Sequence, residues 1–135
     1  MLMLSCESST LRVLVVDDHE LTRLTLQLVF SCQENIQVVG LATNGQEAIE
    51  MVKRHQPDVI VLDLQMPVMD GWSASTHIKA IAPKTQIIAY SSVEDMKSHG
   101  TKASMDAFCK KDVPTTELVA LVRQLGGSAN RSVTG

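Results

Sequence analysis

The sequence predicts an α/β fold, in which helices cover both faces of a parallel β-sheet. Short apolar runs alternate along the chain with longer segments of helical periodicity, and there are five of each. Carboxylates or a lysine directly follow three of the short runs, at the strand ends where open parallel sheets form their sites. The length of 135 residues suits one domain with a core of its own.

Five segments have the length and composition of strands. Four are short runs rich in Val, Ile and Leu with polar, Gly or Pro residues at their ends, and the fifth is a short mixed segment. We expect the strands at residues 11–16, 36–41, 58–62, 86–90 and 106–110.

The segments between the strands carry apolar residues at helical spacing. Asn44 is a candidate N-cap of the second helix, Pro83 stops the third, and Pro114 suits the first turn of the last. The fourth helix, at residues 93–104, has the weakest pattern. The expected buried faces are Leu21, Leu24, Leu28 and Val29 in the first helix, Ala48, Ile49 and Val52 in the second, Trp72, Ile78 and Ile81 in the third, and Leu118, Leu121, Val122 and Leu125 in the last.

Right-handed crossovers leave few topologies for such a chain. We favour a doubly wound sheet with the strand order 2-1-3-4-5, which is the order of flavodoxin-like folds. The folded domain is expected at residues 11–125. Residues 1–10 are polar and irregular and are expected to be a disordered extension, and residues 126–135 a flexible tail or linker.

The overall composition disfavours several classes of function. A formal net charge of −3 and a pI of about 5.7 do not suggest the basic surface that nucleic acid requires. No apolar run approaches the roughly 20 residues of a membrane span, and the first residues lack the regions of a signal peptide. Three cysteines without metal-binding spacing indicate reduced thiols. We therefore expect a cytoplasmic protein that binds neither nucleic acid nor membranes directly.

Four charged residues follow the strand ends. Asp17 and Asp18 follow the first strand, Asp63 the third and Lys111 the fifth. Because the first and third strands are neighbours in the predicted order, the three carboxylates are expected to lie together. Carboxylates this close repel one another unless a cation lies among them, and oxygen ligands of this kind suit Mg²⁺.

A divalent cation and an ammonium group beside one carboxylate make a phosphoryl-transfer site. Asp63 is the candidate nucleophile, which would form an acyl phosphate. The cation and Lys111 would neutralise the charge on the oxygens of the transferred group. Ser91, at the end of the fourth strand, offers a hydroxyl to the same group.

Four short segments carry this pattern, and each is weak when taken singly. They are Val15-Val16-Asp17-Asp18, Asp63 with the loop Met66-Pro67-Val68-Met69-Asp70-Gly71, Ala89-Tyr90-Ser91-Ser92, and Phe108-Cys109-Lys110-Lys111-Asp112. Together, in this order and each at a strand end, they resemble the receiver domain of two-component response regulators. The resemblance covers residues 11–125.

The resemblance implies a role for each charged residue. Asp63 would be the phosphoacceptor. Asp18, Asp63 and the backbone carbonyl of Gln65 would ligate Mg²⁺ directly, and Asp17 would act through water. Lys111 would pair with Asp63 or with its phosphate.

The resemblance also implies a switch and its partners. Ser91 and Phe108 correspond to the hydroxyl and the aromatic residue that move on activation, although many members have tyrosine where Phe108 stands. The phosphate donor would be a sensor histidine kinase or a histidine phosphotransfer protein. The face of the fourth helix, fifth strand and fifth helix would bind a downstream partner, an output domain or a second copy of the chain.

Two other functions fit parts of the pattern. A receiver-fold interaction module that acts without phosphorylation usually lacks an acid or the lysine, and all are present here. A Mg²⁺-dependent phosphatase with an aspartyl nucleophile typically has a second acid where Gln65 stands. His19, after the acid pair, is expected to be an exposed residue of the first helical turn. The sequence thus favours a signalling switch over a turnover enzyme.

Overall fold

The computed structural model describes residues 10–92 and 104–134. The extension expected at residues 1–10 and the helix expected at residues 93–104 fall outside these ranges, apart from one residue of each, so neither expectation is tested. Within the described ranges, no helix has the length and hydropathy that a membrane span requires.

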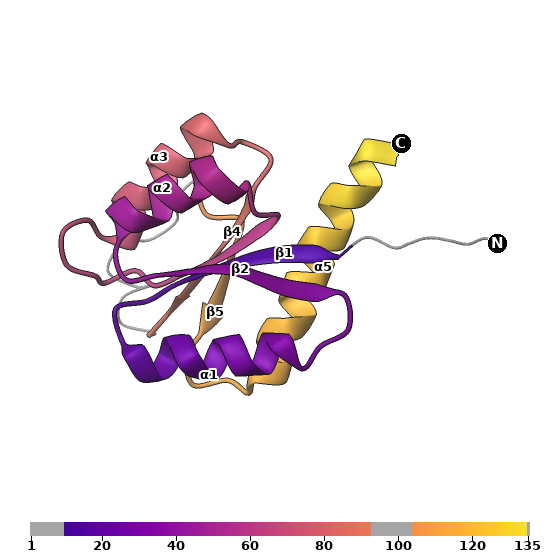
Figure 1. Cartoon of the computed structure of the whole chain (residues 1–135), viewed down its shortest axis with the longest axis horizontal. Helices are drawn as coiled ribbons and strands as arrows, with labels where there is room; N and C mark the ends of the chain where they lie inside the picture. Colours follow the sequence, from indigo (N-terminus) through magenta and orange to yellow (C-terminus); the bar gives the residue numbers. More distant parts are fainter. Residues whose placement is uncertain (1–9, 93–103, 135) are drawn as a thin grey trace.

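Five parallel strands form one sheet in the order β2-β1-β3-β4-β5, which confirms the predicted order (Figure 1). Both faces of the central strands are covered, which is why these strands are apolar almost throughout. Each strand lies within one residue of its predicted bounds. The strands are β1 (Leu11–Val16), β2 (Ile36–Ala42), β3 (Val59–Leu62), β4 (Gln86–Ser91) and β5 (Ala107–Lys110).

Two layers of helices enclose the sheet. In the described residues the helices are α1 (Glu20–Ser31), α2 (Gly45–His55), α3 (Gly71–Ile81) and α5 (Thr115–Thr134). Helices α2 and α3 cover one face of the sheet, and α1 and α5 cover the other (Figure 1).

Strand β1 contributes to the cores on both faces. Leu14 and Val16 belong to the core beneath α2 and α3, whereas Val13 and Val15 belong to the core beneath α1 and α5. This division follows from the alternation of side chains along a strand. The end of β1 is therefore fixed by packing from both sides, and so is the position of the residues that follow it.

The buried face of α1 differs from the one that the periodicity predicts. Leu21, Leu24 and Leu28 are 79%, 50% and 67% exposed, although all three were expected to be buried. The helix instead buries Leu26 and Phe30, at i and i+4. The sequence contains two apolar stripes at helical spacing, and packing against the sheet and α5 buries the one that includes the larger phenylalanine.

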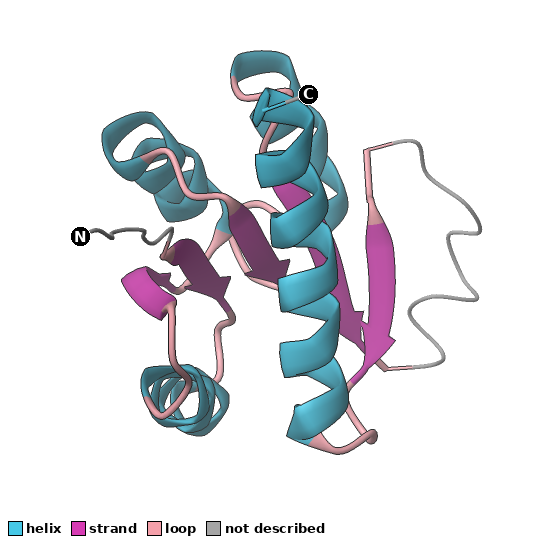
Figure 2. Cartoon of the chain, turned by 90° about the vertical axis from the view of Figure 1, so that its right-hand side faces the viewer, coloured by secondary structure: helices cyan, strands magenta, loops and turns pink. Residues whose placement is uncertain are grey.

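Helix α5 is longer than predicted. It continues without interruption from Thr115 to Thr134 (Figure 2), whereas the sequence suggested an end near Leu125 and a flexible tail beyond it. Gly126 is buried, and a Cβ at this position would lie 2.6 Å from the side chain of Leu11. The lack of a side chain at Gly126 thus lets α5 cross close to Leu11 at the start of β1, and the glycine does not mark the end of the helix.

Side-chain caps fix where α2 and α3 begin. Asn44 Oδ1 accepts a hydrogen bond of 2.9 Å from the Glu47 N–H, which confirms the predicted cap. Asp70 Oδ1 accepts one of 2.8 Å from the Ser73 N–H. The cap at Asp70 places the start of α3 directly after the loop that follows β3.

Candidate functional site

Strand pairing brings two carboxylates to one edge of the sheet. Val16 and Leu62, the last residues of β1 and β3, are register partners, and Asp17 and Asp63 follow them directly. The Asp63 N–H donates to Val16 O at 2.9 Å, and the Asp17 N–H donates to Ala42 O at 3.0 Å. Both acids are buried, with Asp17 1% and Asp63 3% exposed. The hydrogen bonding of the sheet thus continues into the site and fixes the two carboxylates.

The carboxylate of Asp63 has few partners for a buried charge. Its Oδ1 accepts a hydrogen bond of 3.3 Å from the Gln65 N–H and lies 3.5 Å from Lys111 Nζ. Its Oδ2 is buried and has no hydrogen-bond partner among the described residues. Burial and the nearby charge of Asp17 raise the pKa of Asp63 to about 6, and Lys111 offsets only part of this. A perturbed acid of this kind is typical of functional sites.

Lys111 connects the two buried acids. Its backbone N–H donates to Ser91 O at 3.0 Å, which holds the residue beside the end of β4. Its Nζ donates to Asp17 Oδ2 at 2.9 Å and lies 3.5 Å from Asp63 Oδ1. Burial alone would lower the pKa of Lys111, but the hydrogen bond to Asp17 and the charges of both acids raise it. The side chain is therefore an ammonium group at neutral pH.

The two residues expected to form a switch lie on neighbouring strands. Ser91 ends β4 and is 1% exposed. Phe108 is on β5 and is the register partner of Ala89. The Phe108 ring is 37% exposed and lies 6.1 Å from the Trp72 ring, centroid to centroid, at a tilt of 45°. Phe108 is thus a surface contact of Trp72 and not a core residue.

The loop after β3 packs its backbone closely against the site. A Cβ at Gly71 would lie 2.1 Å from Asp63 O, so only glycine lets α3 begin this close to the acid. Val68 has φ 70°, and the Met69 N–H donates to Pro67 O at 2.7 Å. These features describe a γ-turn centred on a β-branched residue, which is a strained conformation. The start of α3 and the loop before it therefore fix the backbone around Asp63.

Two contacts of the site were not expected from the sequence. Arg23 Nη1 donates to Asp17 O at 2.8 Å. His19 Nδ1 lies 3.0 Å from Asp17 Oδ1 and 3.1 Å from Asp18 Oδ1, although the ring is 66% exposed, as expected. The Arg23 N–H donates to His19 O at 3.1 Å, so the two residues are one helical turn apart. That spacing, directly after an acid pair, is the signal that would have predicted both contacts.

The acidic residues fit a divalent cation. One ligand atom from each of Asp17, Asp18, His19 and Asp63 lies within 4.8 Å of all the others. A bound cation would satisfy the Oδ2 of Asp63 and relieve the repulsion that raises the pKa of Asp63. The mostly oxygen donor set suits Mg²⁺. Gln65 adjoins the site through its N–H bond to Asp63, and a metal-binding role for its carbonyl remains a prediction.

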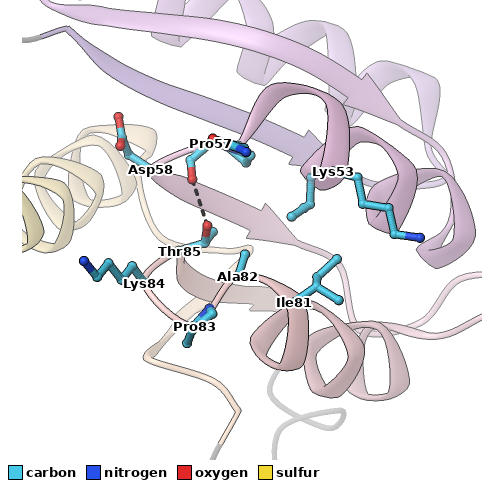
Figure 3. Close-up of a pocket in the computed structure, with 10 residues that line it drawn as sticks. Lys53, Pro57, Asp58, Ile81, Ala82, Pro83, Lys84 and Thr85 are labelled. Atoms are coloured by element: carbon cyan, nitrogen blue, oxygen red, sulfur yellow. Dashed lines mark hydrogen bonds between the residues drawn. The ribbon is translucent and has the colours of Figure 1, made fainter.

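A separate cavity of about 500 Å³ lies at the opposite edge of the sheet, where β3 and β4 begin (Figure 3). In its wall the Thr85 hydroxyl donates to Pro57 O at 2.9 Å. Lys53 and Lys84 extend in opposite directions and do not converge on the cavity. Ile81, which was expected to be buried, lines it and is 46% exposed. The cavity therefore lacks the convergent charges of the acidic site.

Two curated relatives are similar to the chain over most of its length. It is 43% identical over 98 residues to protein-glutamate methylesterase/protein-glutamine glutaminase 2 of Photobacterium profundum, covering 73% of this chain and 24% of the relative. It is 35% identical over 117 residues to the response regulator protein VraR of Staphylococcus aureus, covering 85% of this chain and 56% of the relative. The chain therefore spans between about a quarter and just over half of the length of these relatives.

A solved structure shares the fold. The receiver domain of a sensor histidine kinase from Pseudomonas aeruginosa superposes with a TM-score of 0.79 and 23% identity, covering 88% of this chain and 99% of that domain. In that protein a magnesium ion is coordinated in the active-site cleft. At this level of identity the similarity shows the fold alone, and the fold is the flavodoxin-like fold that the sequence predicts.

The sequence pattern of the response regulator receiver domain matches residues 13–123. This range contains all three acids and Lys111, together with every described strand apart from the first two residues of β1. The chain therefore belongs to the response regulator receiver domain family.

Proposed function

We propose that the chain is a phosphorylation-dependent switch. In this proposal Asp63 accepts a phosphoryl group from a phosphohistidine of a sensor histidine kinase or a histidine phosphotransfer protein. The observation that carries it is the buried Asp63 carboxylate, whose Oδ2 lacks a hydrogen-bond partner in the described chain and whose Oδ1 lies 3.5 Å from Lys111 Nζ. The cytoplasmic location expected from the sequence is part of the proposal, and no separate substrate is turned over.

Each side chain of the site has its own task in the transfer. Because its pKa is about 6, Asp63 is ionised at neutral pH and is still a stronger nucleophile than an ordinary carboxylate. The new bond joins an Asp63 oxygen to phosphorus and the bond from phosphorus to the donor's ring nitrogen breaks. The electron pair of that bond stays on the ring nitrogen, and the imidazole leaves neutral because its other ring nitrogen carries a proton. Lys111 would neutralise the oxygens of the transferred group. Ser91 would donate its hydroxyl hydrogen to one of them.

We propose that the acidic residues hold a Mg²⁺ ion during this transfer. Asp18 and Asp63 would ligate it directly, together with the carbonyl of Gln65, and Asp17 would act through water. When bound, the ion supplies positive charge to the phosphoryl oxygens. The indirect role of Asp17 is supported by its existing partners, because Lys111 Nζ already donates to its Oδ2 at 2.9 Å.

We assign the exposed stripe on α1 to the phosphodonor protein. Leu21, Leu24 and Leu28 are at least half exposed and follow one another at i, i+3 and i+7. Adjoining large apolar side chains on a surface mark an interaction site. Helix α1 begins at Glu20, directly after the acid pair and His19, so a donor that presents its histidine at the mouth of the site lies beside this stripe.

The phosphorylated state is proposed to be read at the face formed by residues 93–104, β5 and α5. The described part of this face contains a groove of about 430 Å³ between β5 and α5, with Phe108, Lys110 and Leu121 in its lining. Lys111 follows β5 directly, so a change at the phosphate is transmitted to this strand over a short path. The proposed occupant is a downstream partner, an output domain or a second copy of the chain.

A receiver-fold interaction module that acts without phosphate is the second candidate function. The observation in its favour is the apolar stripe on α1, which needs no phosphate to bind a partner. The buried oxygen of Asp63, which has no hydrogen-bond partner among the residues that the structure describes, argues against it, because such an arrangement has a cost and no use in a purely structural role.

Titration with beryllofluoride and Mg²⁺ separates the two functions. Trp72 is the sole tryptophan, and it follows the Gly71 that packs on Asp63, so its fluorescence reports on the site. We expect a saturable change that requires Mg²⁺ and is lost in Asp63→Asn. If neither the fluorescence nor an NMR spectrum of the protein responds, the phosphorylation proposal is wrong and the interaction module takes its place.

A further inference from the structure

We infer that Tyr90 is a positioning residue for Lys111, because its aromatic ring holds the ammonium group beside Asp63 through a cation–π contact. The inference rests on the proposed function and gives a task to a residue that the function has not used. Tyr90 is the only tyrosine of the chain, and Lys111 Nζ lies over its ring, 5.8 Å from the centroid. A cation within about 6 Å of a ring centroid is attracted to the negative face of the ring.

The sheet fixes both partners of this contact. Tyr90 is the register partner of Cys109 on β5, and the Lys111 N–H donates to Ser91 O at 3.0 Å. Tyr90 is 6% exposed and packs in the core beneath α1 and α5. Because that core encloses the ring, the ring cannot turn away from the ammonium group without disturbing the packing.

The surroundings of the ammonium group strengthen such a contact. The Lys111 side chain is 28% exposed, so it has lost much of its hydration, and cation–π contacts are strongest where the cation is desolvated. Burial raises the pKa of the Tyr90 phenol, so the ring stays neutral at physiological pH. Lys111 therefore lies over an uncharged ring and not over a phenolate.

The ring differs in kind from the other two partners of the ammonium group. Within residues 10–92 and 104–134, the partners of Lys111 Nζ are Asp17 Oδ2 at 2.9 Å, Asp63 Oδ1 at 3.5 Å and the Tyr90 ring. Both acids accept hydrogen bonds, and the Asp63 carboxylate changes when it becomes an acyl phosphate. The ring attracts the charge without a conventional hydrogen bond, so the N–H groups of Lys111 remain available to the oxygens of the transferred group.

The ring should therefore affect the rate at which Asp63 is phosphorylated. Without it, the ammonium group rests on Asp17, its closest partner, and spends less time beside Asp63. A misplaced group slows a reaction even when the group itself is present. The range of energies of cation–π contacts corresponds to a change of about twofold to thirtyfold in rate.

Fluorinated phenylalanines at position 90 test the inference, because each added fluorine removes negative charge from the ring face and changes its size little. The chain reacts with a small-molecule acyl phosphate and Mg²⁺, and intact-protein mass spectrometry gives the rate of phosphorylation. We expect Tyr90→Phe to react within about twofold of the parent, and three fluorines on that ring to slow the reaction by about threefold to tenfold.

The same fluorinated phenylalanines at position 30 are the matched control. Phe30 lies in the same core as Tyr90, and among the described residues no cation lies over its ring. Fluorination there should leave the rate unchanged. Thermal unfolding of every variant is measured alongside, because a purely structural role of Tyr90 would change the unfolding temperature and not the rate.

The outcomes separate this inference from the proposed function. Equal rates across the series at position 90, a slow Tyr90→Phe protein, or the same fall in the series at Phe30 would each overturn the role of the ring. The proposed function would stand in all three cases, because the parent chain still accepts phosphate. A parent chain that is not phosphorylated would overturn the proposed function and this inference with it.

Discussion

Lys111 forms its closest ion pair with Asp17, at 2.9 Å, and lies 3.5 Å from Asp63, the expected phosphoacceptor. One ammonium group therefore serves two buried carboxylates that come from different strands. The pair with Asp17 holds Lys111 in place while the second contact, with Asp63, remains longer and free to change. This arrangement suits a lysine that must meet a phosphoryl group on Asp63 without moving its backbone.

Removing this ammonium group should destabilise the chain. In Lys111→Met the two buried acids lose their shared hydrogen-bond donor and cation, and we expect the free energy of unfolding to fall by about 1–3 kcal/mol without metal. Chemical denaturation with a chelator present measures the loss. Added Mg²⁺ should restore part of it if the acids bind the ion. Lys110→Met is the matched control, because Lys110 is exposed and makes no ion pair with the described residues. A similar loss of stability there would contradict this account.

Asp63 should make stability depend on pH between about 4 and 6. Its pKa is raised from 3.8 to about 6 by burial first and by Asp17 second. The folded state therefore holds a proton that the unfolded state releases, so stability is greatest below the unfolded pKa and falls as pH rises through the folded one. In Asp63→Asn this fall is absent. Without metal, the variant should be the more stable protein at neutral pH, by at most about 3 kcal/mol.

Denaturation of the parent and of Asp63→Asn at a series of pH values gives the difference directly. If the difference in free energy of unfolding between the two proteins does not widen over this pH interval, burial does not raise the pKa of Asp63. Bound Mg²⁺ should reduce this difference in free energy of unfolding, because it stabilises the ionised carboxylate.

Gly71 should not tolerate a side chain. A Cβ there would meet Asp63 O at 2.1 Å, and this atom is backbone that cannot turn aside. We expect Gly71→Ala to cost about 3 kcal/mol or more and to abolish the beryllofluoride response, because α3 must move away from Asp63. Gly127 on α5 is the matched control, since a Cβ there meets nothing within 4 Å. Gly127→Ala should raise stability by about 0.5–1 kcal/mol, as expected for a glycine within a helix. If Gly71→Ala and Gly127→Ala change the free energy of unfolding equally, the close approach of Gly71 to Asp63 O does not exclude a side chain.

The two apolar stripes of α1 should separate partner binding from stability. Leu24 is 50% exposed, so Leu24→Asp should change the free energy of unfolding by about 0.5 kcal/mol or less. Transfer from a phosphorylated histidine phosphotransfer protein should become slower, whereas phosphorylation by a small-molecule acyl phosphate should not. Leu26 is buried, and Leu26→Ala should cost about 2–5 kcal/mol. Slower reaction of Leu24→Asp with the small molecule as well would place the defect in the chemistry and not in docking.

The sequence alone determined the framework of this protein. The strand positions and their order follow from local hydrophobicity and from the few connections open to alternating strands and helices. The positions of Asp17, Asp18, Asp63 and Lys111 follow from that framework, because a residue just past a strand end has its place set by the backbone. These predictions depended on nearest neighbours in the chain or on paired strands.

Only the tertiary structure decided how individual side chains are used. Two apolar stripes on α1 have helical spacing in the sequence. Packing of the helix against the sheet decided that the stripe with Leu26 and Phe30 is the buried one. Helix α5 continues past Gly126 and Gly127 instead of ending there. Gly126 packs against Leu11, a residue far from it in the sequence. The preference of Lys111 for Asp17 over Asp63 depends on distances of a few ångströms. Such distances are set by the packing of distant segments, which no local pattern in the sequence records.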